Sequence, residues 1–262
     1  MKTYVIANRK GGCGKSATAQ ALSNWLCLQG YKTLLVDADN QANTSYSMGY
    51  DTEADGGLST LYDVLAGTVK MKEVIAPVLA DGQTVSEKWQ IVPASERLAV
   101  FDAGLAPVAV SLPAALKTIE KNFDYCIIDT PLSKGVITMG ALMAADEVII
   151  PCVAEIYSVQ GAQAIAKIIP AAQQYNKKLS VAGILITRHQ ERLAIARGIA
   201  DMIDATAAMI GTKVFKTRIR EGIAVREAAA YRMGLFDYDT RRRSVASADY
   251  MQFFSELMKG GK

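Results

Sequence analysis

Short apolar runs alternate with longer amphipathic segments along most of the chain. The apolar runs are rich in β-branched residues and predict buried strands. They cover Thr3–Asn8, Thr33–Val36, Trp89–Pro93, Tyr125–Asp129, Val148–Val153, Val181–Thr187 and Val214–Thr217. Segments between them show helical spacing of apolar residues, at Lys15–Gln29, Leu112–Lys121, Val159–Tyr175 and Ile195–Ile210. This alternation predicts an α/β fold with a doubly wound, mostly parallel sheet and helices on both faces.

Prolines, a glycine-containing loop and the C-terminal pattern refine this prediction. Pro113 fits the first turn of its helix, and Pro170 is expected to kink or divide the long segment that contains it. The acidic stretch Asp51–Gly57 is predicted to be a mobile loop. Near the C-terminus, i, i+3, i+4, i+7 spacing predicts an amphipathic helix whose apolar face packs on the core. That face comprises Tyr250, Phe253, Phe254, Leu257 and Met258.

Length and composition favour one cytoplasmic domain. The chain has 262 residues, of which 50% are apolar, so it can bury a large core. We find no linker, repeat or low-complexity tract, and we predict a single domain over residues 1–262. No signal-like start and no apolar stretch of about 18 residues is present, so neither secretion nor a membrane span is expected. The cysteines lack the spacing of a zinc site or a disulfide framework. They are Cys13, Cys27, Cys126 and Cys152.

The first predicted strand leads directly into the glycine-rich segment Lys10-Gly11-Gly12-Cys13-Gly14-Lys15-Ser16. Such segments are typical of phosphate-binding loops, in which backbone N–H groups surround phosphates, a lysine reaches the outer phosphates and a hydroxyl binds Mg²⁺. The helix that follows would direct its N-terminal dipole at the same phosphates. The common form G-x-x-x-x-G-K-[ST] requires glycine at Arg9, so this loop deviates from it, and Lys10 is its distinctive residue.

Three aspartates that follow predicted strands fit the same site. Asp129 ends the strand Tyr125–Asp129, where a carboxylate suits the preference of Mg²⁺ for hard oxygen ligands. Asp37 and Asp39 alternate along an extended backbone, so both cannot face the core without a cost. In a nucleotide site, one of them can hold the metal shell and the other can orient an attacking water. Without the phosphate loop, a helix cap and a solvent-facing carboxylate would explain this pair equally well.

Positive charge is concentrated toward the C-terminus, although the formal net charge is only +3. Between Thr187 and Arg243, twelve Lys and Arg residues face seven Asp and Glu residues, whereas the rest of the chain is slightly acidic. This excess indicates a polyanionic partner such as nucleic acid. Solvated surface arginines are the alternative explanation.

Several sequence blocks occur together in a family-specific order and spacing. They are KGGCGKSA, LLVDADNQANTS, IVPAS, FDYCIIDTP, ADEVIIP, GILIT and VFKT.IR....REA. Through them almost the whole chain resembles the ParA/Soj partition ATPases, members of the ParA/MinD group of P-loop ATPases with a deviant Walker A loop. The resemblance implies a Mg²⁺-dependent ATPase that forms an ATP-bound sandwich homodimer on duplex DNA without sequence preference. It also implies a ParB-type centromere-binding partner that stimulates hydrolysis and release, in a DNA segregation system associated with the nucleoid.

The same resemblance implies roles for individual residues. Lys15 contacts the β- and γ-phosphates, and Lys10 reaches across the dimer to the phosphates of the other protomer. Asp39 positions the hydrolytic water. Magnesium is bound by Ser16 directly and held by Asp37 and Asp129 through water. Contacts to the phosphates come from Gly11, Gly12, Cys13, Gly14, Lys15, Ser16 and Ala17.

Three features depart from the family pattern. Asn40 replaces a proline after the second aspartate, and Leu132 replaces the second proline that follows the Walker B aspartate. Both lie in switch-like segments, so they put the rate of hydrolysis and the switch conformation in question more than nucleotide binding. The chain also lacks the N-terminal helix-turn-helix extension of larger relatives, so operator-specific autorepression is not expected.

Non-specific DNA binding is implied for arginines near the last strands, because phosphate contacts need no base reading. Arg192 matches one family position. The other falls near Ala224, which cannot contribute, and the flanking Arg220 and Arg226 are candidates to replace it. Arg218 and the cluster Arg241-Arg242-Arg243 are further candidates. For each arginine, a surface ion pair is the alternative role.

Two other functions on the same fold stay open. A MinD-like membrane-cycling ATPase would need a basic amphipathic C-terminal helix, whereas this one offers Ser255 and Glu256, with Lys259 and Lys262 only at its end. A metabolic ATPase is the other alternative. An iron protein would need a bridging cysteine near Val136, and a ligase or amidotransferase is expected to need additional substrate-binding segments.

Overall fold

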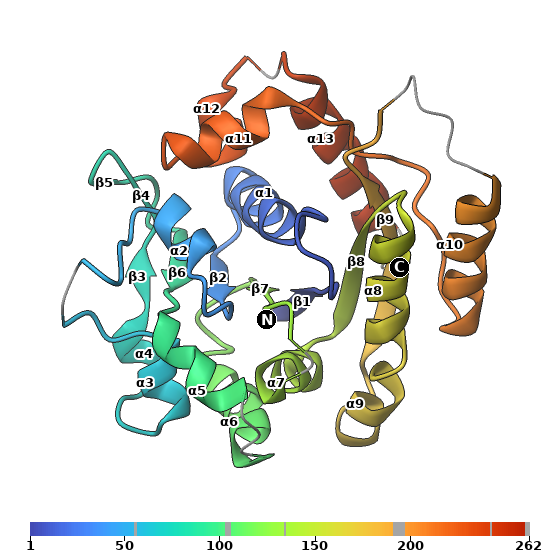
Figure 1. Cartoon of the computed structure of the whole chain (residues 1–262). Coiled ribbons are helices and arrows are strands. Elements are labelled where there is room, and N and C mark those ends of the chain that lie inside the picture. Colours follow the sequence, from blue (N-terminus) through green and yellow to red (C-terminus); the bar gives the residue numbers. More distant parts are fainter. Residues whose placement is uncertain (55–56, 103–105, 134, 191–196, 242, 260–262) are drawn as a thin grey trace.

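The computed structural model describes residues 1–54, 57–102, 106–133, 135–190, 197–241 and 243–259. A seven-stranded sheet in the order β3-β6-β2-β7-β1-β8-β9 forms its centre (Figure 1). All neighbouring strands are parallel except β3 and β6 at one edge. The strands are β1 (Lys2–Ile6), β2 (Thr33–Asp37), β3 (Ala76–Pro77), β6 (Trp89–Val92), β7 (Tyr125–Asp129), β8 (Glu147–Val153) and β9 (Ser180–Thr187). A separate hairpin pairs β4 (Leu79–Ala80) with β5 (Gln83–Thr84).

Helices cover both faces of the sheet (Figure 1). One face carries α1 (Lys15–Leu28), α11 (Ile223–Ala230), α12 (Leu235–Tyr238) and α13 (Val245–Lys259). The other carries α3 (Leu61–Leu65), α4 (Met71–Val74), α5 (Ala99–Asp102), α6 (Ala106–Lys117), α7 (Val136–Ala144), α8 (Ile156–Ala166), α9 (Ile169–Tyr175) and α10 (Arg197–Met209). The short α2 (Asn43–Ser47) follows β2. The predicted doubly wound α/β fold is therefore confirmed.

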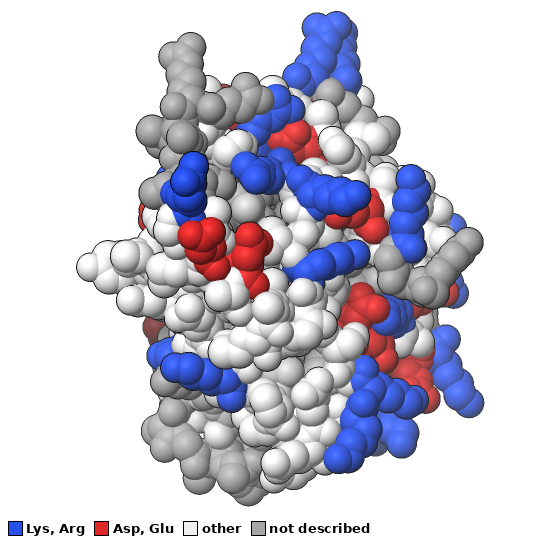
Figure 2. All heavy atoms as spheres, turned by 90° about the vertical axis from the view of Figure 1, so that its right-hand side faces the viewer, with Lys and Arg blue, Asp and Glu red and all other residues white. Residues whose placement is uncertain are grey.

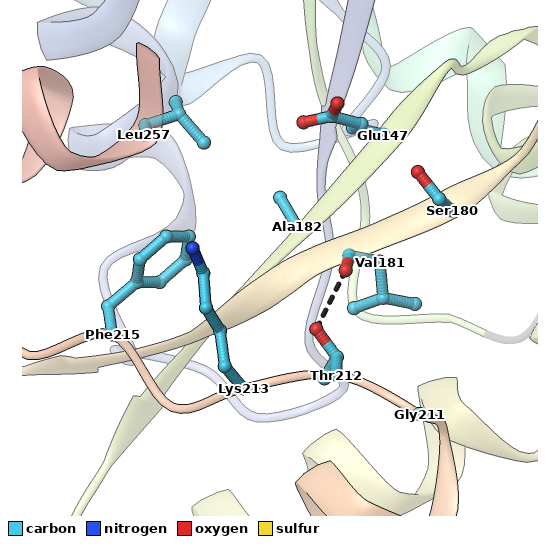
Figure 3. Close-up of a pocket in the computed structure, with 9 residues that line it drawn as sticks. All are labelled: Glu147, Ser180, Val181, Ala182, Gly211, Thr212, Lys213, Phe215 and Leu257. Carbon is cyan, nitrogen blue, oxygen red and sulfur yellow. Dashed lines mark hydrogen bonds between the residues drawn. The ribbon is translucent and has the colours of Figure 1, made fainter. Parts of the chain in front are cut away.

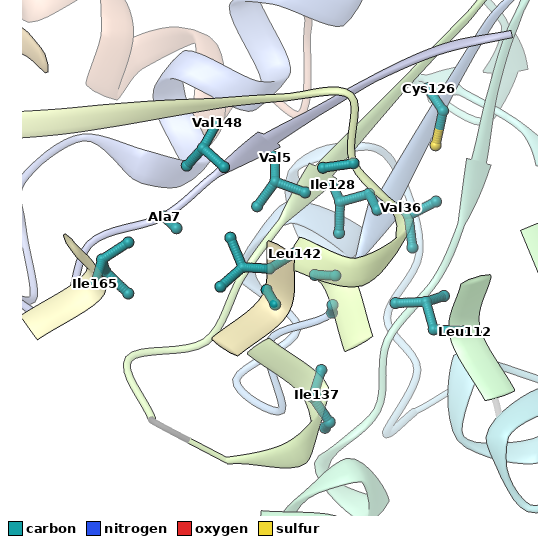
Figure 4. Close-up of a cluster of buried hydrophobic side chains, with 14 of the residues drawn as sticks. Val5, Ala7, Val36, Leu112, Cys126, Ile128, Ile137, Leu142, Val148 and Ile165 are labelled. Carbon is teal, nitrogen blue, oxygen red and sulfur yellow. The ribbon is translucent and has the colours of Figure 1, made fainter. Parts of the chain in front are cut away.

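Two hydrophobic cores lie on opposite faces of the sheet. In β1, Val5 belongs to one core and Ile6 to the other. Successive residues of a strand point to opposite faces. A central strand that is buried on both faces must therefore be apolar throughout, and its sequence reads as a continuous run. Figure 4 shows part of the first core, where Val5, Val36 and Ile128 of three neighbouring strands lie near Leu142 of α7.

Helix α6 corrects the expectation for Pro113. The helix begins at Ala106 and ends at Lys117, so Pro113 lies in its interior and not in its first turn. Proline cannot donate to the carbonyl four residues earlier, which here belongs to Ala109. That carbonyl packs against Gly140 of α7, where an added Cβ would lie only 2.8 Å from the Ala109 oxygen. Close packing of α6 on α7 thus holds the helix together across the proline.

The other helical predictions agree with the structure. The long segment Val159–Tyr175 is divided into α8 and α9, and Pro170 occupies the first turn of α9. Helix α10 covers most of the predicted Ile195–Ile210. The C-terminal helix α13 buries Tyr250, Phe253, Phe254 and Leu257 in the core that it shares with α1. Its apolar face is therefore a packing surface, as predicted.

The segment Val214–Thr217 does not form the predicted strand. Only Val214 makes an isolated bridge, to Ile184 of β9. The Phe215 amide donates to the Ile184 carbonyl at 2.9 Å. The amides of Lys216 and Thr217 donate instead to the carboxylate of Glu256 on α13, at 2.9 and 3.0 Å. A side chain, and not β9, therefore satisfies these two amides. Figure 3 shows the preceding turn beside β9, where Thr212 Oγ1 donates to the Val181 carbonyl at 2.7 Å.

The predicted mobile loop Asp51–Gly57 lies partly outside the described residues. Residues 55 and 56 are not described. The backbone amide of Ala54 donates to Asp51 Oδ1 at 3.2 Å, which forms a local turn at the start of the loop. Mobility of this loop stays a prediction.

Candidate functional site

The glycine-rich loop lies between the carboxyl end of β1 and the start of α1. Gly12 and Gly14 adopt φ values of 72° and 85°, a left-handed conformation that glycine enters without steric cost. The amide of Thr18 donates to the Gly14 carbonyl at 2.9 Å, so helical hydrogen bonding begins within the loop. Lys15 is the first residue of α1 and only 7% exposed. The loop thus has the backbone shape of a phosphate-binding loop at a helix N-terminus.

Neighbouring elements hold this loop from outside. Asn8 Oδ1 accepts the Lys10 amide at 2.9 Å, and Asn8 Nδ2 donates to the Pro151 carbonyl at 2.6 Å. On the other side, Thr187 Oγ1 donates to the Cys13 carbonyl at 2.8 Å. The ends of β8 and β9 therefore position a loop that follows β1, through the side chains of Asn8 and Thr187, to which the sequence assigned no role.

The strand register brings the three predicted aspartates to this loop. Asp129 of β7 pairs with Ile6 of β1 on one side and with Asp37 of β2 on the other. Asp37 and Asp129 are completely buried, and Asp39 is half-buried just beyond β2. Asp39 Oδ1 accepts the Gln41 amide at 3.1 Å. Parallel strands deliver their carboxyl ends to one edge, which explains why distant aspartates meet there.

Helix α2 is attached to both buried carboxylates. Thr44 Oγ1 donates to Asp129 Oδ2 at 2.8 Å. The amide and the hydroxyl of Ser45 both donate to Asp37 Oδ2, each at 2.7 Å. Asp37 Oδ1 accepts the Asp39 amide at 3.1 Å. The segment after β2 is thus folded around the two carboxylates that the sequence assigned to the metal.

Both buried carboxylates have raised pKa values. Burial is the main cause for Asp37, and the nearby charge of Asp129 adds to it. Burial also raises the pKa of Asp129, while Ser16, Lys15 and Thr44 act against that rise. Two adjacent carboxylates in a water-poor site favour a cation between or beside them.

The residues of this site fit a hydrated Mg²⁺ ion. Asp129 Oδ1 is buried and, among the described residues, has no hydrogen-bond partner. Such an orphaned acceptor is costly unless a ligand or water satisfies it. Ser16, in the first turn of α1, and Asp37 lie in the same surroundings. A hydroxyl and two carboxylates near a phosphate loop are the hard oxygen donors that Mg²⁺ prefers.

The buried pair predicts a pH dependence for the metal-free protein. Both pKa values are raised from 3.8 in the folded state. The unfolded chain therefore loses these protons first as the pH rises, and the free energy of unfolding decreases above about pH 4. In EDTA, we expect the melting temperature to fall from about pH 5 to about pH 8 more steeply in the wild type than in Asp37→Asn. Equal slopes in the two proteins would contradict this expectation.

Lys10 lies at the rim of the loop beside exposed apolar side chains. Its Nζ is 5.9 Å from the centre of the Tyr157 ring, at the start of α8. Tyr157 is 68% exposed, and its neighbour Ile156 is 49% exposed. Leu132, which is 43% exposed, approaches Gly11 from the other side. At this part of its rim, the phosphate loop therefore combines the Lys10 cation with an apolar border.

A cavity of about 370 Å³ adjoins the loop on the side of α11 and α13. Gly12, Gly14 and Ala17 line one wall, and Val225 and Tyr250 contribute apolar surface opposite. Its mostly apolar lining next to a phosphate loop is suited to the base and sugar of a nucleotide. The loop and this cavity together can accommodate both halves of ATP.

Arg188 joins this cavity to the loop and was not singled out from the sequence. Its Nη1 donates to the Gly12 carbonyl at 3.5 Å, and its Nη2 forms a 3.0 Å ion pair with Glu221. Hydrogen bonds from Gln190 and Arg188 lower the pKa of Glu221. The available signal was its position directly after β9, at the same sheet edge as the phosphate loop. Asn8 and Thr187 also lie at the carboxyl ends of strands, β1 and β9, on that edge.

A different cavity, of about 350 Å³, lies at the opposite end of the strands (Figure 3). Glu147 and Ser180, the first residues of β8 and β9, line it together with Phe215. The phosphate loop follows the carboxyl end of β1, which runs parallel to β8. The cavity is therefore separate from the predicted nucleotide site.

The predicted DNA-contacting arginines differ in their surroundings. Arg218 and Arg226 are exposed. Arg220 donates through Nε and Nη2 to the carboxylate of Asp249, at 2.9 and 2.7 Å, which anchors its loop to α13. Arg192 lies outside the described residues, as does Arg242 of the basic cluster. Figure 2 shows Lys and Arg side chains interleaved with Asp and Glu on one face.

Comparisons with known proteins agree with this site. Residues 1–181 match the model of a family described as an AAA domain. The chain is 31% identical over 264 residues to the sporulation initiation inhibitor protein Soj of Bacillus subtilis, with 99% of each chain covered. It is 32% identical over 244 residues to the chromosome-partitioning ATPase Soj of Treponema pallidum, covering 92% of this chain and 91% of that protein.

Solved structures share the fold over nearly the whole chain. Apo McdA of Cyanothece gives a TM-score of 0.82 at 25% identity and covers 99% of both chains. A cobyrinic acid a,c-diamide synthase from Mycobacterium smegmatis, with a bound ATP analogue and magnesium, gives 0.81 at 26% identity. That match covers 100% of this chain and 96% of the synthase chain. No described helix of this chain is long and apolar enough to cross a membrane.

The sequence blocks, the phosphate loop with its buried carboxylates and the near-complete matches to Soj proteins lead to one assignment. This chain belongs to the Soj/ParA family of chromosome-partitioning P-loop ATPases.

Proposed function

We propose that this chain is a Mg²⁺-dependent DNA segregation ATPase whose ATP-bound homodimer binds duplex DNA without sequence preference. In this proposal, a ParB-type centromere-binding partner stimulates hydrolysis and thereby releases the dimer from DNA. The observation that carries the proposal is the position of Lys10, at the apolar rim of a complete phosphate loop. A lysine placed there can contact the phosphates of the nucleotide bound to a second protomer. Nucleotide binding and dimerisation would then be coupled.

Each part of the site has a role in hydrolysis. Lys15 neutralises the outer phosphates, and the loop amides from Gly11 to Ala17 hold their oxygens. Asp39, the half-buried carboxylate, orients the attacking water. A bound Mg²⁺ ion supplies charge neutralisation, with Ser16, Asp37 and Asp129 as the residues that hold it. Such a reaction needs positioning and charge stabilisation and no covalent intermediate.

The exposed rim supports a homodimer. Leu132, Ile156 and Tyr157 leave apolar surface in solvent around the place where the outer phosphates of ATP would lie. Contact with a second copy would remove this surface from water, which is favourable. The same contact would place Lys10 of each protomer near the nucleotide of the other. Lys10 then acts on the transition state as an arginine finger does.

The basic C-terminal third supports DNA binding through phosphate contacts. Arg218, in the segment before α11, and Arg226, within α11, are exposed. Arg226 also lines the cavity beside the phosphate loop, so of the two Arg218 is the candidate for DNA contact that does not line the nucleotide site. Neutralising DNA phosphates releases counterions, so affinity of this kind falls steeply with salt. Arg220 combines a structural ion pair with Asp249 and is the weaker candidate. Arg192 stays a candidate from the sequence alone.

Retention on DNA and on liposomes, measured in parallel, tests this proposal. With ATP and Mg²⁺, we expect retention on random-sequence duplex DNA that falls more than tenfold between about 50 and 200 mM salt. With ADP, we expect little retention. Arg218→Ala should weaken DNA binding and flatten its salt dependence while ATP affinity is unchanged. Arg226→Ala should do the same, but its ATP affinity is measured first because Arg226 lines the nucleotide cavity. Arg97→Ala is the matched control and should bind DNA as the wild type does. Arg97 is also exposed, but it forms an ion pair with Asp63 of α3.

The same experiment decides between the alternatives. ATP-loaded protein that pellets with liposomes and shows no DNA retention would favour membrane cycling, although the buried apolar face of α13 argues against it. A metabolic ATPase is the second candidate. The expectation that a ligase or amidotransferase needs extra segments is not supported, because this chain covers 96% of a synthase chain. ATP turnover without retention on DNA or liposomes would favour that reading.

A further inference from the structure

We propose that Thr44 is a positioning residue for the magnesium site, and that it sets the orientation of the Asp129 carboxylate. This inference rests on the proposed Mg²⁺-dependent function. Thr44 lies on α2, which follows Asp39 in the chain, and its side chain is only 1% exposed. It is joined by hydrogen bonds to α1 on one side and to β7 on the other.

The two hydrogen bonds of Thr44 have a defined direction. Gln20 Nε2 on α1 donates to Thr44 Oγ1 at 3.0 Å, and an amide nitrogen can only donate. The single hydroxyl proton of Thr44 is therefore available for Asp129 Oδ2, which accepts it at 2.8 Å. The series Gln20, Thr44, Asp129 thus directs one hydrogen bond at Oδ2 of the carboxylate.

This arrangement leaves the other oxygen of Asp129 for the metal site. Asp129 Oδ1 is buried and unpartnered among the described residues, while Oδ2 is occupied by Thr44. Rotation of the carboxylate would break the Thr44 bond and leave a buried acceptor unsatisfied, which is costly. Thr44 therefore holds the carboxylate in one orientation, in which Oδ1 is left to accept from a metal-bound water and Ser16 and Lys15 of the phosphate loop are nearby. Mutation of a residue that hydrogen-bonds to a metal-binding side chain typically lowers metal affinity by about 10- to 100-fold.

A magnesium titration of thermal stability tests the inference without measuring turnover. The melting temperature is followed at saturating ADP while Mg²⁺ is increased, and the midpoint Mg²⁺ concentration is compared between variants. Thr44→Val keeps the shape and removes the hydroxyl, so we expect its midpoint to rise about tenfold or more. Thr44→Ser keeps the hydroxyl and should behave as the wild type does. ADP in EDTA should stabilise all three proteins equally.

A second variant guards against a folding defect in Thr44→Val. Gln20→Leu leaves the Thr44 hydroxyl in place but removes the donor that directs its proton, so a smaller rise in the midpoint is expected. Equal midpoints for Thr44→Val and the wild type, or equal shifts for Thr44→Val and Thr44→Ser, would overturn the inference. Absence of any Mg²⁺-dependent stabilisation of the wild-type protein by ADP would instead refute the proposed function.

Discussion

Replacing Lys15 with alanine is expected to abolish ATP-dependent dimerisation and DNA retention. Lys15 begins α1 and is 7% exposed, so its ammonium group is held at the phosphate loop and not in bulk solvent. Removal of one charge-stabilising donor from such a preorganised site typically lowers the catalytic rate by about 10²- to 10³-fold. Fluorescence titration with a labelled ATP measures the loss of nucleotide affinity, and gel filtration with ATP measures the dimer.

Lys10→Ala is the matched control from the same loop. Lys10 lies at the rim beside Tyr157, so its removal should leave nucleotide binding to the single protomer intact while preventing the dimer. Unchanged ATP affinity in Lys15→Ala would contradict the assigned roles. Equal loss of ATP affinity in both variants would also contradict them, because Lys10 would then act within its own protomer.

Replacing Gly161 with alanine is expected to weaken ATP binding, even though alanine favours helices by about 1 kcal/mol over glycine. Gly161 lies in α8 against the start of the phosphate loop. An added Cβ would collide with Asn8 Oδ1 and lie 3.0 Å from the amide nitrogen of Lys10. Asn8 is itself held by the carbonyls of Pro151 and Ser158, so the loop must shift.

A shift of the loop misplaces the groups that hold the phosphates. In enzymes, a displacement of about 1 Å can lower the reaction rate by about 10²-fold. We therefore expect Gly161→Ala to lose at least tenfold in ATP affinity, measured by the same titration. Gly198→Ala is the control, because Gly198 lies in α10 and, apart from its chain neighbours and the backbone of its own helix, no described residue comes within 4 Å of a Cβ added there. It should bind ATP normally and melt at the same or a higher temperature. Normal ATP affinity in Gly161→Ala would show that the contact is easily relieved.

The central strands could be predicted almost residue by residue. The strand predicted at Tyr125–Asp129 coincides with β7, and the predicted Thr33–Val36 is one residue shorter than β2. Both strands lie inside the sheet and are buried on both faces, so their sequences are mostly apolar up to the aspartate that ends each of them. The edge strand β3 and the hairpin strands β4 and β5 have two residues each and leave no such pattern.

Two errors in the predicted elements have long-range causes. Val214–Thr217 has the composition of a strand, but Glu256, about forty residues later, accepts the amides of its last two residues, Lys216 and Thr217. Pro113 resembles a helix start, but packing of Gly140 against Ala109 allows α6 to extend through it. In each case a partner distant in the chain competes successfully with the local preference, and a sequence window cannot show that partner.

By itself, the sequence determined the fold class, the phosphate loop and the three aspartates, because chemistry of this kind depends on residue types at fixed short spacings. Tertiary structure alone decided how these parts are held. Asn8, Thr187 and Gly161 shape the loop from β1, β9 and α8, and α2 orients the buried carboxylates through Thr44 and Ser45. These contacts join residues up to 174 positions apart. Only the parallel strand register, which gathers the carboxyl ends of distant strands at one edge, brings them together.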